Sequence, residues 1–244
     1  MKVVVCMKQV PDTNEVRINQ ETGTLIRDGV PSIMNPDDKN ALEESLRMKD
    51  EWGAEVIALS MGPPQASEIL REALSMGVDQ AILLSDRKFG GSDTWATGSI
   101  LAAAVEKIGD VDVVFCGRQA IDGDTAQVGP EMAEFLNIPQ ITYVKELSRE
   151  GEALRVRRFS EYGDFVYQVT PPVLLTAIKD LNVPRYPSVR GILKHYDPEV
   201  QEIITWGFDD LGVDESRVGL GGSLTNVYRS FVPVKSKQIG RAHV

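Results

Sequence analysis

One loop of this chain, residues 117–130, joins small residues to hydrogen-bonding side chains in the order Gly-Arg-Gln-Ala-Ile-Asp-Gly-Asp-Thr-Ala-Gln-Val-Gly-Pro. Small residues before a helix leave backbone N–H groups free to bind phosphate. Carboxylates repel phosphate, so we expect Asp122 and Asp124 to accept hydrogen bonds from ribose hydroxyls, an adenine amine or neighbouring backbone. The sequence therefore predicts a nucleotide-binding loop, and a surface turn rich in Gly and Asp is the alternative. The candidate binding residues are Asp122, Gly123, Asp124, Thr125, Ala126, Gln127, Val128, Gly129 and Pro130.

Short apolar runs alternate with helical patterns before this loop, which predicts a parallel, doubly wound, Rossmann-like α/β sheet. The expected strands cover residues 2–7, 55–60, 80–84 and 111–116, and the expected helices cover residues 36–52, 67–76 and 94–108. Residues 15–27 indicate a hairpin around a turn at residues 20–23. Asn35 is the expected N-cap of the first helix, and Gly53 is its expected end.

The carboxyl ends of parallel strands meet at one edge of a sheet, so a nucleotide crevice is expected where the first, second and fourth strands end. Residues that end the first two strands or open the first helix then join the loop at residues 122–130. These further binding candidates are Cys6, Lys8, Asn35, Pro36, Asp37, Asp38, Met61 and Gly62.

The pattern changes after Pro139 to β-rich segments that finish or extend the sheet. These segments cover residues 141–147, 154–161, 165–170 and 173–177. Regular periodicity fades beyond Pro187, which predicts an α/β domain at residues 1–190 and an extended arm at residues 191–244. The arm carries the apolar anchors Trp206, Phe208, Val227, Tyr228 and Phe231, and we expect it to pack on a partner chain.

Composition describes an ordinary globular protein, because 42% of the 244 residues are hydrophobic and 25% are charged. The 26 Lys and Arg against 36 Asp and Glu give a formal charge of −10, which argues against general binding to nucleic acid or anionic membranes. No segment approaches the roughly 18 consecutive apolar residues of a spanning helix, so the cytoplasm is the expected location.

Histidine and cysteine are scarce. His195 and His243 lie in no cluster of metal-ligand spacing, so we expect neither a metal site nor a Ser-His-Asp triad. Cys6 and Cys116 both end strand-like runs, and reduced thiols at the edge of the sheet are expected there rather than a disulfide. The residue types therefore favour ligand binding over acid, base or nucleophilic catalysis by side chains.

The loop lacks the Gly-Lys-Ser/Thr ending and the Gly-x-Gly-x-x-Gly spacing of common phosphate loops. It resembles instead the beta subunits of electron transfer flavoproteins, which carry Gly-Arg/Lys-Gln-Ala-Ile-Asp running into Asp-x-x-Gln-x-Gly after the fourth strand. The resemblance extends to residues 1–11, 34–38, 61–63, 73–77 and 182–186. It implies an adenine nucleotide in the crevice: AMP in mitochondrial-type members, or a complete FAD in the bifurcating subgroup.

Residues 86–97 resemble the glycine-rich loop of the bifurcating subgroup, which ends in Asp-Thr-x-Ala-Thr. Gly90 and Gly91 would let a flat ring system approach the backbone, and Thr94 and Thr97 could direct hydroxyls to an isoalloxazine edge. The start of a helix also favours an electron-rich flavin. Ordinary capping by residues 92–94 is the alternative. The cofactor-binding candidates here are Gly90, Gly91, Thr94, Ala96 and Thr97.

The resemblance further implies a heterodimer with an alpha subunit that carries a second FAD. NADH would reduce the FAD of this chain, and electrons would divide between ferredoxin or flavodoxin and, through the alpha subunit, an acyl-CoA dehydrogenase. Residues 182–193 resemble the family's recognition loop, with Val189 near the position where Leu is usual. Two alternatives stay open: a subunit that holds structural AMP, and a self-associating ATP-binding module of the stress-response type.

Overall fold

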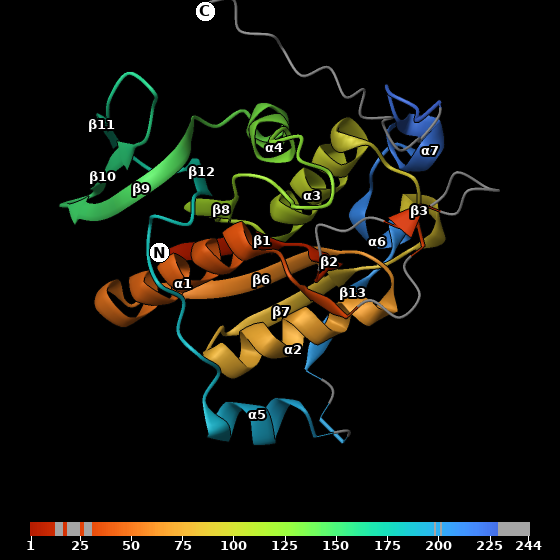
Figure 1. Cartoon of the computed structure of the whole chain (residues 1–244), viewed down its shortest axis with the longest axis horizontal. Helices are drawn as coiled ribbons and strands as arrows, with labels where there is room; N and C mark the ends of the chain where they lie inside the picture. The colour runs from red at the N-terminus through yellow and green to blue at the C-terminus, as the bar shows by residue number, and fades with distance from the viewer. Residues whose placement is uncertain (13–16, 19–24, 27–30, 198, 201, 229–244) are drawn as a thin grey trace, which may run out of the picture.

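A computed structural model describes the chain except residues 13–16, 19–24, 27–30, 198, 201 and 229–244 (Figure 1). Nine strands of the described residues form one sheet in the order β11-β10-β9-β12-β8-β1-β6-β7-β13. Their bounds are β1 (Lys2–Met7), β6 (Glu55–Met61), β7 (Gln80–Leu84), β8 (Val113–Gly117), β9 (Gln140–Glu150), β10 (Ala153–Arg158), β11 (Phe165–Val169), β12 (Val173–Ala177) and β13 (Ile203–Trp206). The seven neighbouring strands β9, β12, β8, β1, β6, β7 and β13 pair in parallel. β10 and β11 extend the sheet beyond β9 as an antiparallel edge. The predicted α/β class is confirmed.

The middle strands are apolar throughout because helices cover both faces of the sheet. Val4 of β1 lies between Ile57 of β6 and Val114 of β8 in the register, and all three side chains are buried. Val3 and Val5 contribute to a hydrophobic cluster on one face, and Val4 contributes to a second cluster on the other.

Two helix pairs form the outer layers (Figure 1). Helices α1 (Pro36–Trp52) and α2 (Ser67–Met76) bury Leu42 and Leu70 in the first cluster, and α3 (Thr94–Ile108) and α4 (Val128–Leu136) bury Ile100 and Met132 in the second. The predicted bounds of α1, α2 and α3 are confirmed. Gly53 ends α1 with a φ of 69°, a left-handed conformation that favours glycine.

The predicted hairpin pairs β3 (Arg17–Ile18) antiparallel with β4 (Leu25–Ile26), and its turn at residues 20–23 lies outside the described residues. A second short pair joins β2 (Gln9–Pro11) to β5 (Ser32–Met34). These two pairs form the excursion between β1 and α1, and they return the chain so that the start of α1 lies beside the end of β1. Asn35 N donates to Lys8 O at 2.9 Å at this point.

The structure of residues 191–228 differs from the predicted extended arm. Helix α5 (Val189–His195) leads to β13, which pairs in parallel with β7 and completes one edge of the main sheet. The remaining described elements are α6 (Phe208–Leu211), α7 (Gly219–Gly222) and the 3-10 turns η1 (Pro64–Ala66), η2 (Arg87–Phe89) and η3 (Glu215–Arg217). Trp206 and Phe208 pack against the second cluster of this same chain, since strand pairing carries them onto its surface.

Two other predicted anchors of the arm, Val227 and Tyr228, are 84% and 100% exposed, and Phe231 lies outside the described residues. Packing of the arm on a partner therefore stays a prediction for the chain from Val227 onward. Within the described part of the chain, no helix is both long and apolar enough to cross a bilayer.

Candidate nucleotide site

The first turn of α1 links the ends of β1 and β8 through the buried carboxylate of Asp38. Its Oδ2 accepts a hydrogen bond from the backbone N–H of Lys8 at 2.8 Å, and its Oδ1 accepts one from Gly117 at 2.9 Å. Burial raises the pKa of Asp38 to about 7, against the lowering effect of these hydrogen bonds. Asp38 was predicted to bind the ligand. Both of its oxygens accept backbone hydrogen bonds that link the ends of β1 and β8, and a direct contact with a ligand stays a prediction.

Asn35 connects the same helix to the nucleotide-binding loop. Its Nδ2 donates to the carbonyl of Gln119 at 2.9 Å, and its Oδ1 accepts from the N–H of Ile121 at 3.0 Å. Asn35 does occupy the N-cap position, as predicted, but its side chain makes no capping hydrogen bond. The side-chain amide of Asn35 bonds to residues distant in the sequence because the loop after β8 lies against the first turn of α1.

The exposed part of the loop carries the predicted polar groups. Lys8 Nζ lies 2.7 and 2.8 Å from the two carboxylate oxygens of Asp122, and Gln119 Nε2 donates to Asp124 Oδ1 at 2.7 Å. Asp124 and Ala126 have φ angles of 53° and 54°, which are uncommon for residues with a side chain. The ion pair joins the chain segments that follow β1 and β8.

Glycines near the loop have different roles. A Cβ on Gly129 would lie 2.9 Å from Cys116 Sγ and 3.0 Å from Thr176 Cγ2, so this glycine lets α4 approach the sheet. At Gly123 nothing lies within 4 Å of a Cβ. The predicted close approach of a ligand therefore has room at Gly123, whereas the requirement at Gly129 comes from helix packing.

Several predicted residues support the crevice from beneath. Burial raises the pKa of Cys6 to about 12 and that of Cys116 well above its usual value, and both thiols are free. Asp37 lies 3.4 Å from Arg118 Nε, and burial raises the pKa of this carboxyl more than Arg118 lowers it. Three other predicted residues lie where strands end or a helix begins: Pro36 is the first residue of α1, Met61 is the last of β6, and Gly62 donates its N–H to Leu84 O at 3.0 Å. The rest lie at the start of α4: Thr125 is exposed, Gln127 is the N-cap without a side-chain capping hydrogen bond, and Val128 and Pro130 belong to the first turn.

The second predicted loop lies beside the first. Thr94, the first residue of α3, donates its hydroxyl to Glu131 Oε1 of α4 at 3.1 Å, and a Cβ on Gly98 would be 3.2 Å from Glu131 Cβ. Glu131 Oε2 is buried without a hydrogen-bond partner among the described residues. Asp93 caps α3 by accepting from the N–H of Ala96 at 3.0 Å, as the capping alternative predicted. Thr97 lies in the same first turn and is half-buried.

The chain's own C-terminal region meets this second loop. Gly91 has a φ of 77°, and a Cβ there would lie 3.2 Å from Leu220 Cβ, so Leu220 makes the close approach that was predicted for a ring system. No pattern in the sequence indicates this contact, because Leu220 lies in a Gly-rich stretch without periodicity. Glu131 and Gln119 were also missed, since their roles depend on partners that only the fold brings near.

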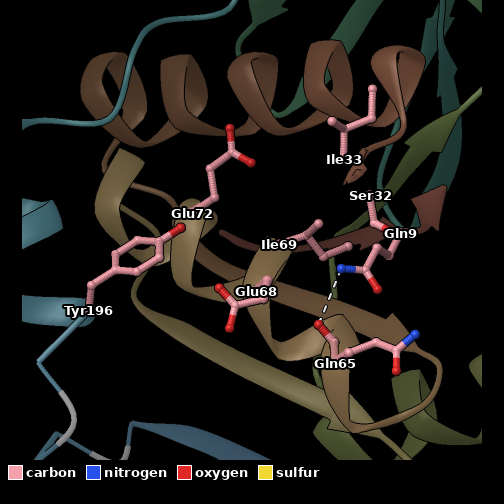
Figure 2. Close-up of a pocket in the computed structure, with 8 residues that line it drawn as sticks. All are labelled: Gln9, Ser32, Ile33, Gln65, Glu68, Ile69, Glu72 and Tyr196. Atoms are coloured by element: carbon pink, nitrogen blue, oxygen red, sulfur yellow. Dashed lines mark hydrogen bonds between the residues drawn. The ribbon is translucent and has the colours of Figure 1, made fainter. Parts of the chain in front are cut away.

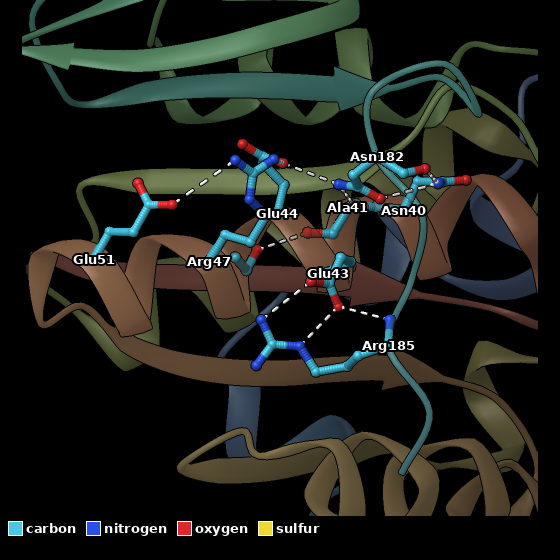
Figure 3. A network of polar contacts seen from close by, with 9 residues as sticks. Asn40, Ala41, Glu43, Glu44, Arg47, Glu51, Asn182 and Arg185 are labelled. Atoms are coloured by element: carbon cyan, nitrogen blue, oxygen red, sulfur yellow. Dashed lines mark hydrogen bonds and ion pairs between the residues drawn. The ribbon is translucent and has the colours of Figure 1, made fainter.

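Residues 182–185, the start of the predicted recognition loop, are fixed on α1 (Figure 3). Arg185 Nε and Nη2 donate to the two carboxylate oxygens of Glu43 at 2.9 and 3.0 Å, and its Nη1 lies 2.8 Å from Asp50. Asn182 Nδ2 donates to the carbonyl of Asn40 at 3.0 Å and to Glu44 at 2.9 Å. This polar clamp leaves nearby apolar side chains in solvent, namely Val183, Tyr186, Val189 and Leu193, which are 74–93% exposed.

Two cavities lie away from the crevice. The first, of about 460 Å³, is lined by Gln9, Ser32, Ile33, Gln65, Glu68, Ile69, Glu72 and Tyr196 (Figure 2). The second, of about 360 Å³, lies between α2 and α5. Lys39 and Arg71 already pair with Glu72 and Glu68, so neither carboxylate is free for a cation. None of the predicted nucleotide-binding residues lines either cavity.

The region where β1 and β8 end offers chemistry that suits an adenine nucleotide. It combines the ion pair of Lys8 with Asp122, the exposed carboxylate of Asp124, which also accepts from Gln119, and the N-terminus of α4, whose N-cap Gln127 makes no capping hydrogen bond. The described residues hold no group of three or more His, Cys, Asp or Glu that could bind a metal ion. The donor set therefore fits phosphate, ribose and adenine groups.

Comparison with known proteins identifies the family of the chain. The electron transfer flavoprotein domain matches residues 22–204. The electron transfer flavoprotein subunit beta of Clostridium acetobutylicum is 59% identical over 94% of this chain and 87% of its own length. The caffeyl-CoA reductase-Etf complex subunit CarD of Acetobacterium woodii is 56% identical over 96% and 88%, and the acryloyl-CoA reductase electron transfer subunit gamma of Anaerotignum propionicum is 47% identical over 96% and 89%. The chain therefore belongs to the electron transfer flavoprotein family, among its beta subunits.

Proposed function

We propose that this chain is the FAD-binding beta subunit of a heterodimeric electron transfer flavoprotein that bifurcates electrons from NADH. The observation that supports a complete FAD is the contact between the start of α3, in the second predicted loop, and the first turn of α4, directly after the first loop, made by Thr94 Oγ1 and Glu131 Oε1 at 3.1 Å. It joins the crevice after β8 to the start of α3, so one extended ligand can reach both. An adenine nucleotide alone would need only the first loop.

When bound, FAD would supply the redox chemistry: it would take up a hydride from NADH, release the proton, and pass the two electrons on singly, one to ferredoxin or flavodoxin and one, through the alpha-subunit FAD, to an acyl-CoA dehydrogenase. The residues of this chain position the cofactor. Asn35 and Asp38 fix the loop that receives the adenosine part. Thr97 would present its hydroxyl to the isoalloxazine edge, Thr94, whose hydroxyl proton goes to Glu131 Oε1, would present an acceptor oxygen, and the N-terminus of α3 would stabilise the electron-rich ring.

The names of the relatives support the proposed partners. One relative is named as a subunit of a caffeyl-CoA reductase-Etf complex, and another as an electron transfer subunit of acryloyl-CoA reductase. We propose that this chain likewise works with an alpha subunit and an acyl-CoA dehydrogenase, in the cytoplasm. Its charge of −10 is consistent with partners other than nucleic acid or membrane.

A structural AMP is the second candidate ligand. The contact of Leu220 with Gly91 favours it, because a side chain of the protein takes the space that a ring system was predicted to use. Acid release of nucleotides from the purified heterodimer separates the two candidates. We expect two FAD per heterodimer without stoichiometric AMP, whereas one FAD and one AMP would support the second candidate.

Coupled turnover tests bifurcation itself. Purified heterodimer, acyl-CoA dehydrogenase and ferredoxin are mixed with NADH, and bleaching of ferredoxin is followed with and without an enoyl-CoA. We expect bleaching only with the enoyl-CoA, because an electron that falls to this better acceptor supplies the free energy for the low-potential carrier. Equal bleaching in both mixtures, or none in either with flavins fully loaded, would leave a conventional electron shuttle.

A further inference from the structure

Residues 219–225, here named the C-terminal latch, are bonded to the loop that precedes α3. Leu220 N donates to Gly90 O at 3.2 Å, and Gly219 N donates to Ser92 Oγ at 3.0 Å. A Cβ on Gly219 would lie 2.2 Å from Lys88 O, so only glycine allows the latch to lie this close. The latch and the loop therefore fit together along their backbones.

Asp93 connects the latch to the start of α3 through hydrogen bonds. Its Oδ1 accepts from Ala96 N at 3.0 Å and caps α3, while its Oδ2 accepts from the N–H and hydroxyl of Thr225 at 2.8 and 2.9 Å. Its own N–H donates to Ser223 Oγ at 2.9 Å. One carboxylate thus serves both the cap of α3 and the end of the latch.

Asp93 also sets the position of the two threonines proposed to contact the flavin. Thr94 follows it directly, and Thr97 N donates to Asp93 O at 2.9 Å in the first helical turn. A change in the backbone or side-chain rotamer of Asp93 moves this turn, and hydrogen bonds to a charged group are the ones that resist such a change most strongly.

We infer that Ser223 and Thr225 are positioning residues of the flavin site, which they control by holding Asp93 and the first turn of α3. The inference rests on the proposed binding of FAD by this chain. It assigns to the C-terminal region a role inside its own subunit, in addition to any contact with a partner. Among the hydrogen bonds of the described residues, the latch makes none to a predicted adenosine-binding residue, so we expect its effect at the isoalloxazine end.

Three variants of the full chain, each purified with the alpha subunit, test the inference. The double variant Ser223→Ala/Thr225→Val removes both side-chain hydroxyls, Thr225→Ser keeps the hydroxyl that bonds to Asp93, and Asn226→Ala changes an exposed neighbour as the control. FAD content, the Kd for FAD added to stripped heterodimer, and the visible absorption and circular dichroism of the flavins are measured beside the thermal unfolding midpoint.

We expect the double variant to bind the beta-subunit FAD roughly tenfold more weakly and to shift its visible spectrum, because Asp93 loses the hydroxyl bond of Thr225 to its carboxylate and the Ser223 oxygen that accepts from its N–H. Thr225→Ser and Asn226→Ala should resemble the wild type. A lowered unfolding midpoint with an unchanged flavin spectrum and Kd would overturn the inference and leave the latch a purely structural role. If the wild type holds one FAD and one AMP, the proposed function and the inference both fail. Two FAD that are unaffected by the double variant overturn the inference alone.

Discussion

Gly117 shows how tightly the crevice is built at the level of single residues. A Cβ on this glycine would lie 2.3 Å from Asp38 Oδ1 and 2.6 Å from Asp38 N. The close approach is what allows the N–H of Gly117 to donate to this carboxylate. Asp38 and Gly117 therefore depend on each other, although they are far apart in the sequence.

Substitution of Gly117 by Ala should lower the free energy of unfolding by about 1–3 kcal/mol, the usual cost of forcing extra volume into a packed site. It should also reduce the nucleotide content of the purified protein. Gly123→Ala is the matched control, because nothing lies within 4 Å of its Cβ and its φ is not positive. Urea unfolding of both variants measures the difference, and equal stabilities would contradict the described fit.

Asp38 should also leave a signature in the pH dependence of stability. Its folded pKa is raised to about 7 from a reference of 3.8, so the folded protein binds the proton more tightly than the unfolded chain does. The stability from this proton is fully present below about pH 4 and is lost as pH rises through 7, by up to about 1.4 kcal/mol per pH unit. The difference in unfolding free energy between wild type and Asp38→Asn should therefore fall from pH 5 to pH 7 and level off above. A difference that is constant with pH would show that Asp38 does not titrate there.

The sequence predicted the positions of the residues where β1 and β8 end better than it predicted their hydrogen bonds. Asn35, Lys8 and Asp122 were all predicted at the crevice from strand ends and helix-start signals, and the structure brings them together. The amide of Asn35 was expected to cap its own helix, since local hydrogen bonding is all that a local pattern can indicate. Its use by the loop after β8 depends on chain geometry more than eighty residues away.

At the level of elements, α1 has two separate tasks. Its first turn holds the crevice through Asn35 and Asp38, and its middle turns hold residues 182–185 through Glu43 and Glu44. Glu43 is only 5% exposed, so Arg185 supplies the charge that makes its burial tolerable. Displacement of this helix would therefore disturb the crevice and the exposed apolar segment together.

Removal of the Arg185 side chain by Arg185→Ala should cost about 2 kcal/mol of unfolding free energy, because a buried carboxylate loses charged hydrogen bonds. Amide hydrogens of residues 182–188 should exchange faster with solvent, as mass spectrometry can measure. Arg71→Ala is the control: its pair with Glu68 lies on the surface of α2 and should cost less than about 1 kcal/mol. Unaltered exchange in the Arg185 variant would mean that the clamp does not hold this segment.

Helices and strands whose ends are marked by nearby residues could be predicted from the sequence. A strand that forms only because it pairs with a strand far away in the sequence could not. Pro36 and Gly53 mark the ends of α1, and the run Gln80–Leu84 of β7 is continuous and apolar. β13 has only four residues and follows a stretch without periodicity. Its identity as a strand comes from pairing with β7, which no window of the sequence around residue 203 contains.

For the whole molecule, two truncations separate folding from assembly. A chain that ends after Asn226 keeps β13 and the C-terminal latch, so its unfolding midpoint should match that of the full chain. It loses Val227, Tyr228 and the predicted anchor Phe231, and we expect much weaker binding of the alpha subunit. A chain that ends after Tyr196 loses β13 and should be less stable by itself. Gel filtration with the alpha subunit checks both, and normal heterodimer formation by the longer truncation would contradict the predicted arm.

The pairing of β13 with β7 also has a consequence for the biosynthesis of the protein. A nascent chain folds as it leaves the ribosome, and β7 emerges long before Ile203, which pairs with Ala81. Until then β7 is an open edge with the apolar residues Ala81–Leu84 and unpaired backbone groups, the kind of surface on which chains aggregate. Closing the long intervening loop also slows this final pairing. Ribosomes stalled before residue 203 should therefore carry an aggregation-prone intermediate, and β13, the last strand among the described residues, is the one that covers this edge of the sheet.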